Sequence, residues 1–162
     1  MILNINSKLD NYEFKLCENL NQILNKIKGD TNKIACSKLE SSLKDCGEWL
    51  FDYVEYSENE ISFNNVIYSV LSDIHLIVEC EWDFYRKENY FIDLKYDFEK
   101  ILVGKSNYRL FIFEHDNVKK AKEIIKNFKI IALNFDKLEK NERILFAVWI
   151  KGKHFYFENY VK

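Results

Sequence analysis

Proline is absent from the 162 residues and glycine occurs only four times, so residues that break regular elements are scarce. Gly29, Gly47, Gly104 and Gly152 are therefore the clearest markers of where elements end. The sequence also contains no glycine-rich phosphate loop, no GxSxG and no HExxH. These absences exclude the nucleotide-binding, serine-hydrolase and zinc-peptidase classes that the three motifs define.

The four cysteines form no CxxC pair, which excludes a dithiol redox motif and a regular zinc spacing. We expect them to be buried free thiols. No apolar run is long enough to cross a bilayer, and the opening residues lack the basic start and apolar centre of a signal peptide. The sequence therefore predicts a cytoplasmic protein with no membrane contact.

Apolar residues make up 48% of the chain and aromatic residues 16%, which is enough for one well-buried core. We expect a single domain over residues 1–162, with an N-terminal helical part at 1–47 and an α/β core with a C-terminal hairpin at 48–162. The net charge of -2 hides an asymmetry, because residues 48–99 carry 13 acids and three bases. That segment repels phosphate unless cations neutralise it.

Hydrophobic periodicity predicts helices interleaved with strands. The expected helices are residues 9–27, 32–46, 63–74, 89–103 and 117–127. The expected strands are residues 48–56, 75–82, 107–114 and 130–135, followed by a hairpin of 144–151 and 154–160 that turns at "KGK". This alternation indicates an α/β sheet covered on both faces.

The stretch "HLIVECEWDFY" ends an apolar strand in alternating acids. Because side chains alternate across a strand, Leu76, Val78, Cys80 and Trp82 form one apolar face. The other face carries Ile77, Glu79, Glu81 and Asp83. Two or three carboxylates should therefore converge on one side of the sheet.

Asp52 lies between the apolar residues Leu50 and Val54 on the strand expected next to this one. If the two strands pair, Asp52, Glu79 and Glu81 can bring carboxylate oxygens together, a ligand set that suits Mg²⁺ or Mn²⁺. Such an ion would activate a water and stabilise charge on a phosphodiester. The alternative is that the two glutamates lie at a solvated strand end and pair with lysines.

Three segments, "GEWLFDYVEY", "LIVECEWD" and "IDLKYDFEKILVGKSNYRLFIFE", resemble a lineage of small bacterial proteins in the PD-(D/E)XK, or restriction-endonuclease-like, nuclease superfamily. The resemblance implies a mixed sheet flanked by helices, with one Asp on an early strand and a Glu-x-Lys pair on the next. Asp52 and Glu79 match the acidic positions. Glu81 stands where the family usually has lysine, and Lys100 is the candidate for a lysine that has migrated to the following helix.

The resemblance implies a metal-dependent nuclease, with Asp52 and Glu79 holding Mg²⁺ or Mn²⁺. Glu81 would be an additional ligand or a base, and Lys100 would lie near the developing phosphate charge. A competing interpretation makes Lys100 an ordinary i,i+3 partner of Asp97. The alternative function is a catalytically inactive member of the same fold that binds or inhibits a protein through its acidic surface, in a phage or defence setting. A third alternative is a homo-oligomer formed through the aromatic closing hairpin.

Overall fold

Three helices and six strands form the part of the chain that the computed structural model describes, which comprises residues 9–26, 44–45, 51–82, 90–151 and 154–162. The helices are α1 (Asn11–Lys26), α3 (Tyr90–Val103) and α4 (Val118–Asn134). The strands are β1 (Lys44–Asp45), β2 (Tyr53–Phe63), β3 (Val66–Glu81), β4 (Tyr108–His115), β5 (Arg143–Ile150) and β6 (His154–Val161).

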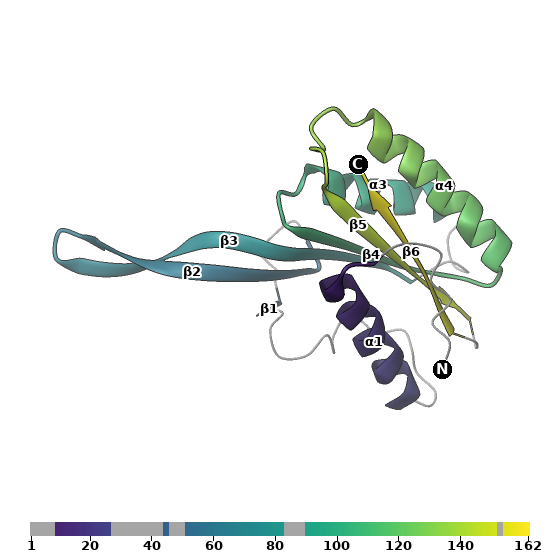
Figure 1. Cartoon of the computed structure of the whole chain (residues 1–162), viewed down its shortest axis with the longest axis horizontal. Coiled ribbons are helices and arrows are strands. Elements are labelled where there is room, and N and C mark those ends of the chain that lie inside the picture. The colour runs from purple at the N-terminus through teal and green to yellow at the C-terminus, as the bar shows by residue number, and fades with distance from the viewer. Residues whose placement is uncertain (1–8, 27–43, 46–50, 83–89, 152–153) are drawn as a thin grey trace.

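The strands form one mixed sheet in the order of the sequence, β1 to β6. The β3–β4 and β4–β5 pairs are parallel, and the other three pairs are antiparallel. The α3 and α4 helices connect the parallel strands and cover one face of the sheet, while α1 covers the other (Figure 1). The predicted mixed α/β sheet with both faces covered is therefore confirmed.

Local sequence signals fix the helix ends. At the start of α1, the carboxylate of Asp10 accepts the backbone N–H groups of Tyr12 and Glu13, and Glu13 accepts the N–H of Asp10, which is a capping box. Asn117 caps α4 by accepting the N–H groups of Lys119 and Lys120. The N–H of Gly104 bonds to the carbonyl of Lys100 as α3 ends.

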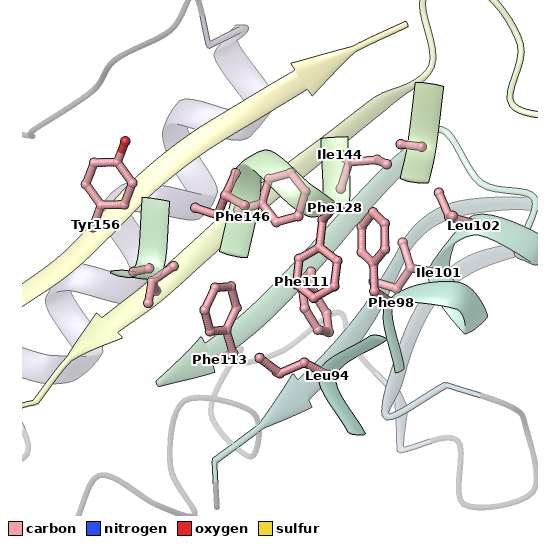
Figure 2. Packing of buried hydrophobic residues seen from close by; sticks show 14 of the residues in the cluster. Leu94, Phe98, Ile101, Leu102, Phe111, Phe113, Phe128, Ile144, Phe146 and Tyr156 are labelled. Atoms are coloured by element: carbon pink, nitrogen blue, oxygen red, sulfur yellow. The ribbon is translucent and has the colours of Figure 1, made fainter. Parts of the chain in front are cut away.

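The larger core cluster lies between the sheet and helices α3 and α4 (Figure 2). Four fully buried phenyl rings form its centre: Phe98, Phe111, Phe128 and Phe146. The ring centroids of Phe98 and Phe128 are 4.5 Å apart, so the two helices are packed through these rings. Burial of each ring contributes on the order of 2–3 kcal/mol to folding.

A two-stranded arm projects from this body (Figure 1). In β3 only Leu76–Glu81 pair with β4, so residues 56–75 of the β2–β3 hairpin, which we call the arm, extend beyond the rest of the sheet. Its tip is the turn at Asn64 and Asn65, whose φ angles of 50° and 63° match the two-residue turn that joins twisted antiparallel strands.

The arm corrects the prediction of a helix over residues 63–74. That prediction was wrong because apolar residues recur at spacings of three and four when both faces of a hairpin carry them. The predicted strand at 130–135 was also wrong, since α4 continues to Asn134 with Ala132 buried. Within the predicted helix at 32–46, residues 44–45 form β1, and the remainder lies outside the described residues, as do residues 48–50 of the first predicted strand.

The other elements agree with prediction to within a few residues: α1, α3, β4, residues 118–127 of α4 and the β5–β6 hairpin. The cysteine expectation had a mixed outcome. Cys17 is free and buried, as expected. Cys80 is disulfide-bonded, so the free-thiol expectation was wrong for this residue. Spacing along the sequence does not reveal which thiols meet in space.

Candidate functional site at the root of the arm

The alternation predicted for β3 is present in the structure. Leu76 and Val78 pack into the cluster beneath α1, whereas Glu79 faces α3 on the opposite side of the sheet. The predicted pairing of the two acidic strands is also present, because β2 and β3 are antiparallel with Tyr53 opposite Val78. This register brings Asp52 next to Glu79.

Asp52 and Glu79 are connected through the backbone. The N–H of Asp52 donates to Glu79 Oε1 at 3.2 Å, and the N–H of Cys80 donates to Asp52 Oδ2 at 2.7 Å. Glu79 is only 1% exposed, while Asp52 is exposed at the surface. The two carboxylates therefore lie close together but use their oxygens to join the start of β2 to β3.

Lys100 reaches this pair from α3. Its Nζ lies 2.5 Å from Glu79 Oε2 and 3.0 Å from Asp97 Oδ1. Lys100 is therefore an i,i+3 partner of Asp97, as the competing interpretation predicts, and it also pairs with Glu79, while a role near a phosphate stays a prediction. We call Asp52, Glu79, Glu81, Asp97 and Lys100 the root cluster.

Burial dominates the electrostatics of the root cluster. It raises the pKa of Glu79 to about 7, a shift that Lys100 opposes and Asp52 reinforces. Burial also raises the pKa of Asp97, and the hydrogen bond to Glu81 adds to that rise. Burial works to lower the pKa of Lys100, but its hydrogen bonds to Glu79 and Asp97 outweigh burial and raise it. Lys100 therefore stays charged between two acids.

The side chains as they lie do not fit a divalent ion. Both oxygens of Glu79 already accept donors, one from Asp52 and one from Lys100. Among the described residues, no three His, Cys, Asp or Glu side chains are placed to hold a metal. Lys100 supplies one positive charge to the four carboxyl groups of the cluster and already lies between Glu79 and Asp97, so the cluster is a hydrogen-bonded ion network.

A second polar group crosses the base of the arm. His75 Nε2 lies 2.5 Å from the Ser57 hydroxyl, and His75 Nδ1 lies 3.2 Å from Asp73 Oδ2. This is the order of groups in a serine-hydrolase triad, but the His75 and Asp73 side chains are 38% and 48% exposed. Water competes for every hydrogen bond at such exposure, which argues against a catalytic triad. We therefore assign the group a structural role, since it joins the two strands of the arm. Sequence reasoning missed it because the predicted helix separated these residues.

The arm itself presents two different faces, because cross-strand partners share a face. We call one the apolar face. It carries Ile61, Phe63, Val66 and Tyr68, each between 47% and 64% exposed. We call the other the acidic face. It carries Glu58, Glu60, Ser62 and Ser69, with the exposed side chains of Ile67 and Leu71 beside them.

Within the described ranges, no helix is long and apolar enough to cross a membrane. Compared with known proteins, the chain matches no family model, no curated protein and no solved structure. The resemblance to the PD-(D/E)XK superfamily therefore stays a prediction, carried only by the sequence segments that suggested it.

Proposed function

We propose that the protein is a non-catalytic binding module that recognises another protein with its arm. The observation that carries this proposal is an isolated hairpin (Figure 1) on which six large apolar side chains are exposed, four on the apolar face and two on the acidic face. A two-stranded hairpin is at best marginally stable in water on its own, and an exposed apolar patch of this kind marks an interaction site. A partner that covers the arm would supply the missing burial.

The charge of the arm indicates which class of partner it binds. The arm contains Glu58, Glu60 and Asp73 and has neither lysine nor arginine. Such a surface repels the phosphates of nucleic acid and of anionic lipid, and it attracts a basic protein. The apolar residues then provide the burial, while the acids favour a partner whose contact surface carries positive charge.

The root cluster supports the same proposal. Glu79 is buried, so a substrate cannot reach its carboxylate, and its ion pair with Lys100 joins β3 to α3. Asp52 joins the start of β2 to β3 by its own hydrogen bonds. These contacts fix the direction in which the arm leaves the body, which lowers the entropy lost when a partner binds.

The test compares apolar residues on and off the arm. Phe63→Ser with Tyr68→Ser removes two exposed apolar side chains from the arm, and Ile130→Ser with Leu133→Ser removes two from α4. A partner isolated on the immobilised protein is purified and its affinity is measured for each variant. We expect the arm variant to bind at least about tenfold more weakly and the α4 variant to bind normally. The reverse pattern, or the absence of any arm-dependent partner, would contradict the proposal.

A second candidate function is metal-dependent phosphodiester hydrolysis, supported by the meeting of Asp52, Glu79 and Lys100 from separate segments. Calorimetric titration with Mn²⁺ and Mg²⁺, beside Asp52→Ala and Glu79→Ala, separates the two candidates. Stoichiometric binding that both variants abolish, together with divalent-dependent cleavage of DNA or RNA, would favour the nuclease. We expect neither, because both carboxylate oxygens of Glu79 already accept donors, from the Asp52 N–H and from Lys100.

A further inference from the structure

We propose that the partner binds as an extended strand that adds to the free edge of β2, through a segment in which basic and apolar residues alternate. This inference rests on the arm being the binding element, and it specifies how the arm is recognised. Strand addition to an exposed edge is an established mode of peptide recognition, in which the backbone supplies affinity and alternate side chains supply specificity.

The backbone of β2 is available for such pairing. In the described part of the chain, β1 pairs only with Tyr53 and Val54, so β2 from Glu55 to Phe63 is paired on one side, by β3. Exposed edges are normally blocked by charged side chains, most often lysine, by proline or by a bulge. This edge has neither lysine nor proline, and its two register shifts lie near the base, at Glu55/Tyr56 and Ser57/Glu58. Residues 58–63 therefore form a regular edge whose charged side chains, Glu58 and Glu60, are both acidic, so they oppose an acidic strand and favour a basic one.

The side chains of β2 define the chemistry of the added strand. From Glu58 to Phe63 they alternate, with Glu58, Glu60 and Ser62 on the acidic face and Ile61 and Phe63 on the apolar face. A strand hydrogen-bonded to this edge places its own alternate side chains beside these two sets. Lysine or arginine on the acidic side and aliphatic or aromatic residues on the apolar side make the complementary pattern.

The opposite edge of the arm is less suitable. At its base, the N–H of Asn107 donates to the carbonyl of Ile74, and the side-chain amide of Asn107 donates to Asp73, so the body already covers that end of β3. The acids of the tip, Glu58 and Glu60, both belong to β2. The acidic side chains of the tip and the backbone groups open to a further strand therefore both belong to β2.

The probe is a fluorescently labelled, C-terminally amidated peptide, Lys-Val-Lys-Tyr-Lys-Val-Lys, titrated against the full chain and followed by anisotropy. Its control has the same composition with the four lysines contiguous. We expect the alternating peptide to bind at least about tenfold more tightly than the control. Glu58→Lys with Glu60→Lys should abolish this binding, and a peptide with glutamate in place of each lysine should restore it.

Backbone pairing is tested with two N-methylated forms of the alternating peptide, one methylated at the odd and one at the even positions. Alternate N–H groups of a strand point to opposite edges, so we expect one form to lose at least about tenfold in affinity while the other still binds. Hydrogen exchange should also slow at the amides of residues 58–63.

Several results would overturn strand addition. They are equal binding of both methylated forms and the parent peptide, equal binding of the contiguous control, or no binding up to about 1 mM. If the isolated partner still depends on Phe63 and Tyr68, those results leave the proposed function standing and reject only the mode of recognition. If that dependence is also missing, both proposals fail.

Discussion

At the scale of single residues, the electrostatic stability of the root cluster depends on one lysine. Lys100 lies within 3.0 Å of two carboxylates, and one of them, Glu79, is almost completely buried. A buried carboxylate that loses its partner keeps the full cost of desolvation or takes up a proton. The stability of this region should therefore depend on Lys100 and on pH.

Lys100→Met should lower the free energy of unfolding by about 2–4 kcal/mol at pH 8, because the ionised carboxylate of Glu79 is left buried without a cation. The loss should be smaller at pH 5, where Glu79 binds a proton. Urea denaturation at the two pH values measures both. Lys95→Met on the same helix is the matched control, since the side chain of its partner Glu99 is 45% exposed, and it should cost less than about 1 kcal/mol. Equal losses in the two variants would contradict the prediction.

The pKa of Glu79 also predicts how stability changes with pH. In the unfolded chain this carboxyl titrates near 4.5, whereas in the folded protein its pKa is about 7. The folded state therefore binds more protons between these values, so its stability falls as pH rises from about 4.5 to about 7, by on the order of 3 kcal/mol.

Glu79→Gln should remove this contribution, and the difference between its stability curve and that of the unaltered protein isolates Glu79 from other titrating groups. Glu99→Gln serves as the control at an exposed position. Chemical denaturation from pH 4.5 to pH 8 gives both curves. A Glu79→Gln curve parallel to that of the unaltered protein over the whole range would refute the assignment.

At the scale of elements, the hydrophobic pattern predicted the helices and strands that have at least one buried face. Helices α1 and α3 each pack an apolar side onto the sheet, and strands β4 and β5 are buried along most of their length. The arm has no buried face outside its root, so apolar residues stand on both faces of its β3 half and hide the period of two, although Ile61 and Phe63 still alternate with polar residues on β2. The Asn64–Asn65 turn marks the tip. The end of α4 was missed because "KIIAL" has the composition of a strand, while packing of Ala132 decides for helix.

The candidate site was predictable in part. Alternation placed Glu79 opposite Leu76 and Val78 from residue order alone, whereas Lys100 was expected near Glu79 only because of the resemblance to the nuclease superfamily. The direct contact between them depends on how α3 packs over β3, which no local pattern contains. The sequence also could not show that the ammonium group of Lys100 would lie between Asp97 and Glu79, which was expected to hold a metal ion.

Gly104 provides a prediction at this scale, because it ends α3 next to the root of the arm. A Cβ built on Gly104 would lie 2.5 Å from both Ile77 Cδ1 and Phe51 Cζ. Gly104→Ala should therefore destabilise the protein by about 1–3 kcal/mol through overpacking. Thermal unfolding measures the loss. Val103→Ala, at an exposed neighbouring position, should have little effect, and an equal effect at both positions would contradict a steric origin.

At the scale of the whole molecule, the body and the arm differ in how they are held. The body has two core clusters on opposite faces of the sheet, whereas the arm beyond its root is held by the pairing of its own two strands. Local stability should follow this difference, with amides at the tip of the arm exchanging far faster than those of β4 and β5.

Replacement of residues 58–72 by Asn-Gly, which joins the cross-strand partners Ser57 and Asp73 by a two-residue turn, should leave the body folded. We expect Tm to change by less than about 3 °C, since no buried core residue is removed. Calorimetry and circular dichroism test this expectation. Loss of cooperative unfolding would show that the arm is part of the folding unit.

The absence of lysine and arginine from the arm has a practical consequence for protein chemistry. Between Lys44 and Arg86 the sequence contains no cleavage site for trypsin, so the entire arm remains in one long tryptic fragment whether or not it is covered. Amine-directed labels and crosslinkers also cannot attach to it. Chymotrypsin, which cleaves after Phe63 and Tyr68 at the tip, is the protease whose cutting rate should report whether a bound partner covers the arm.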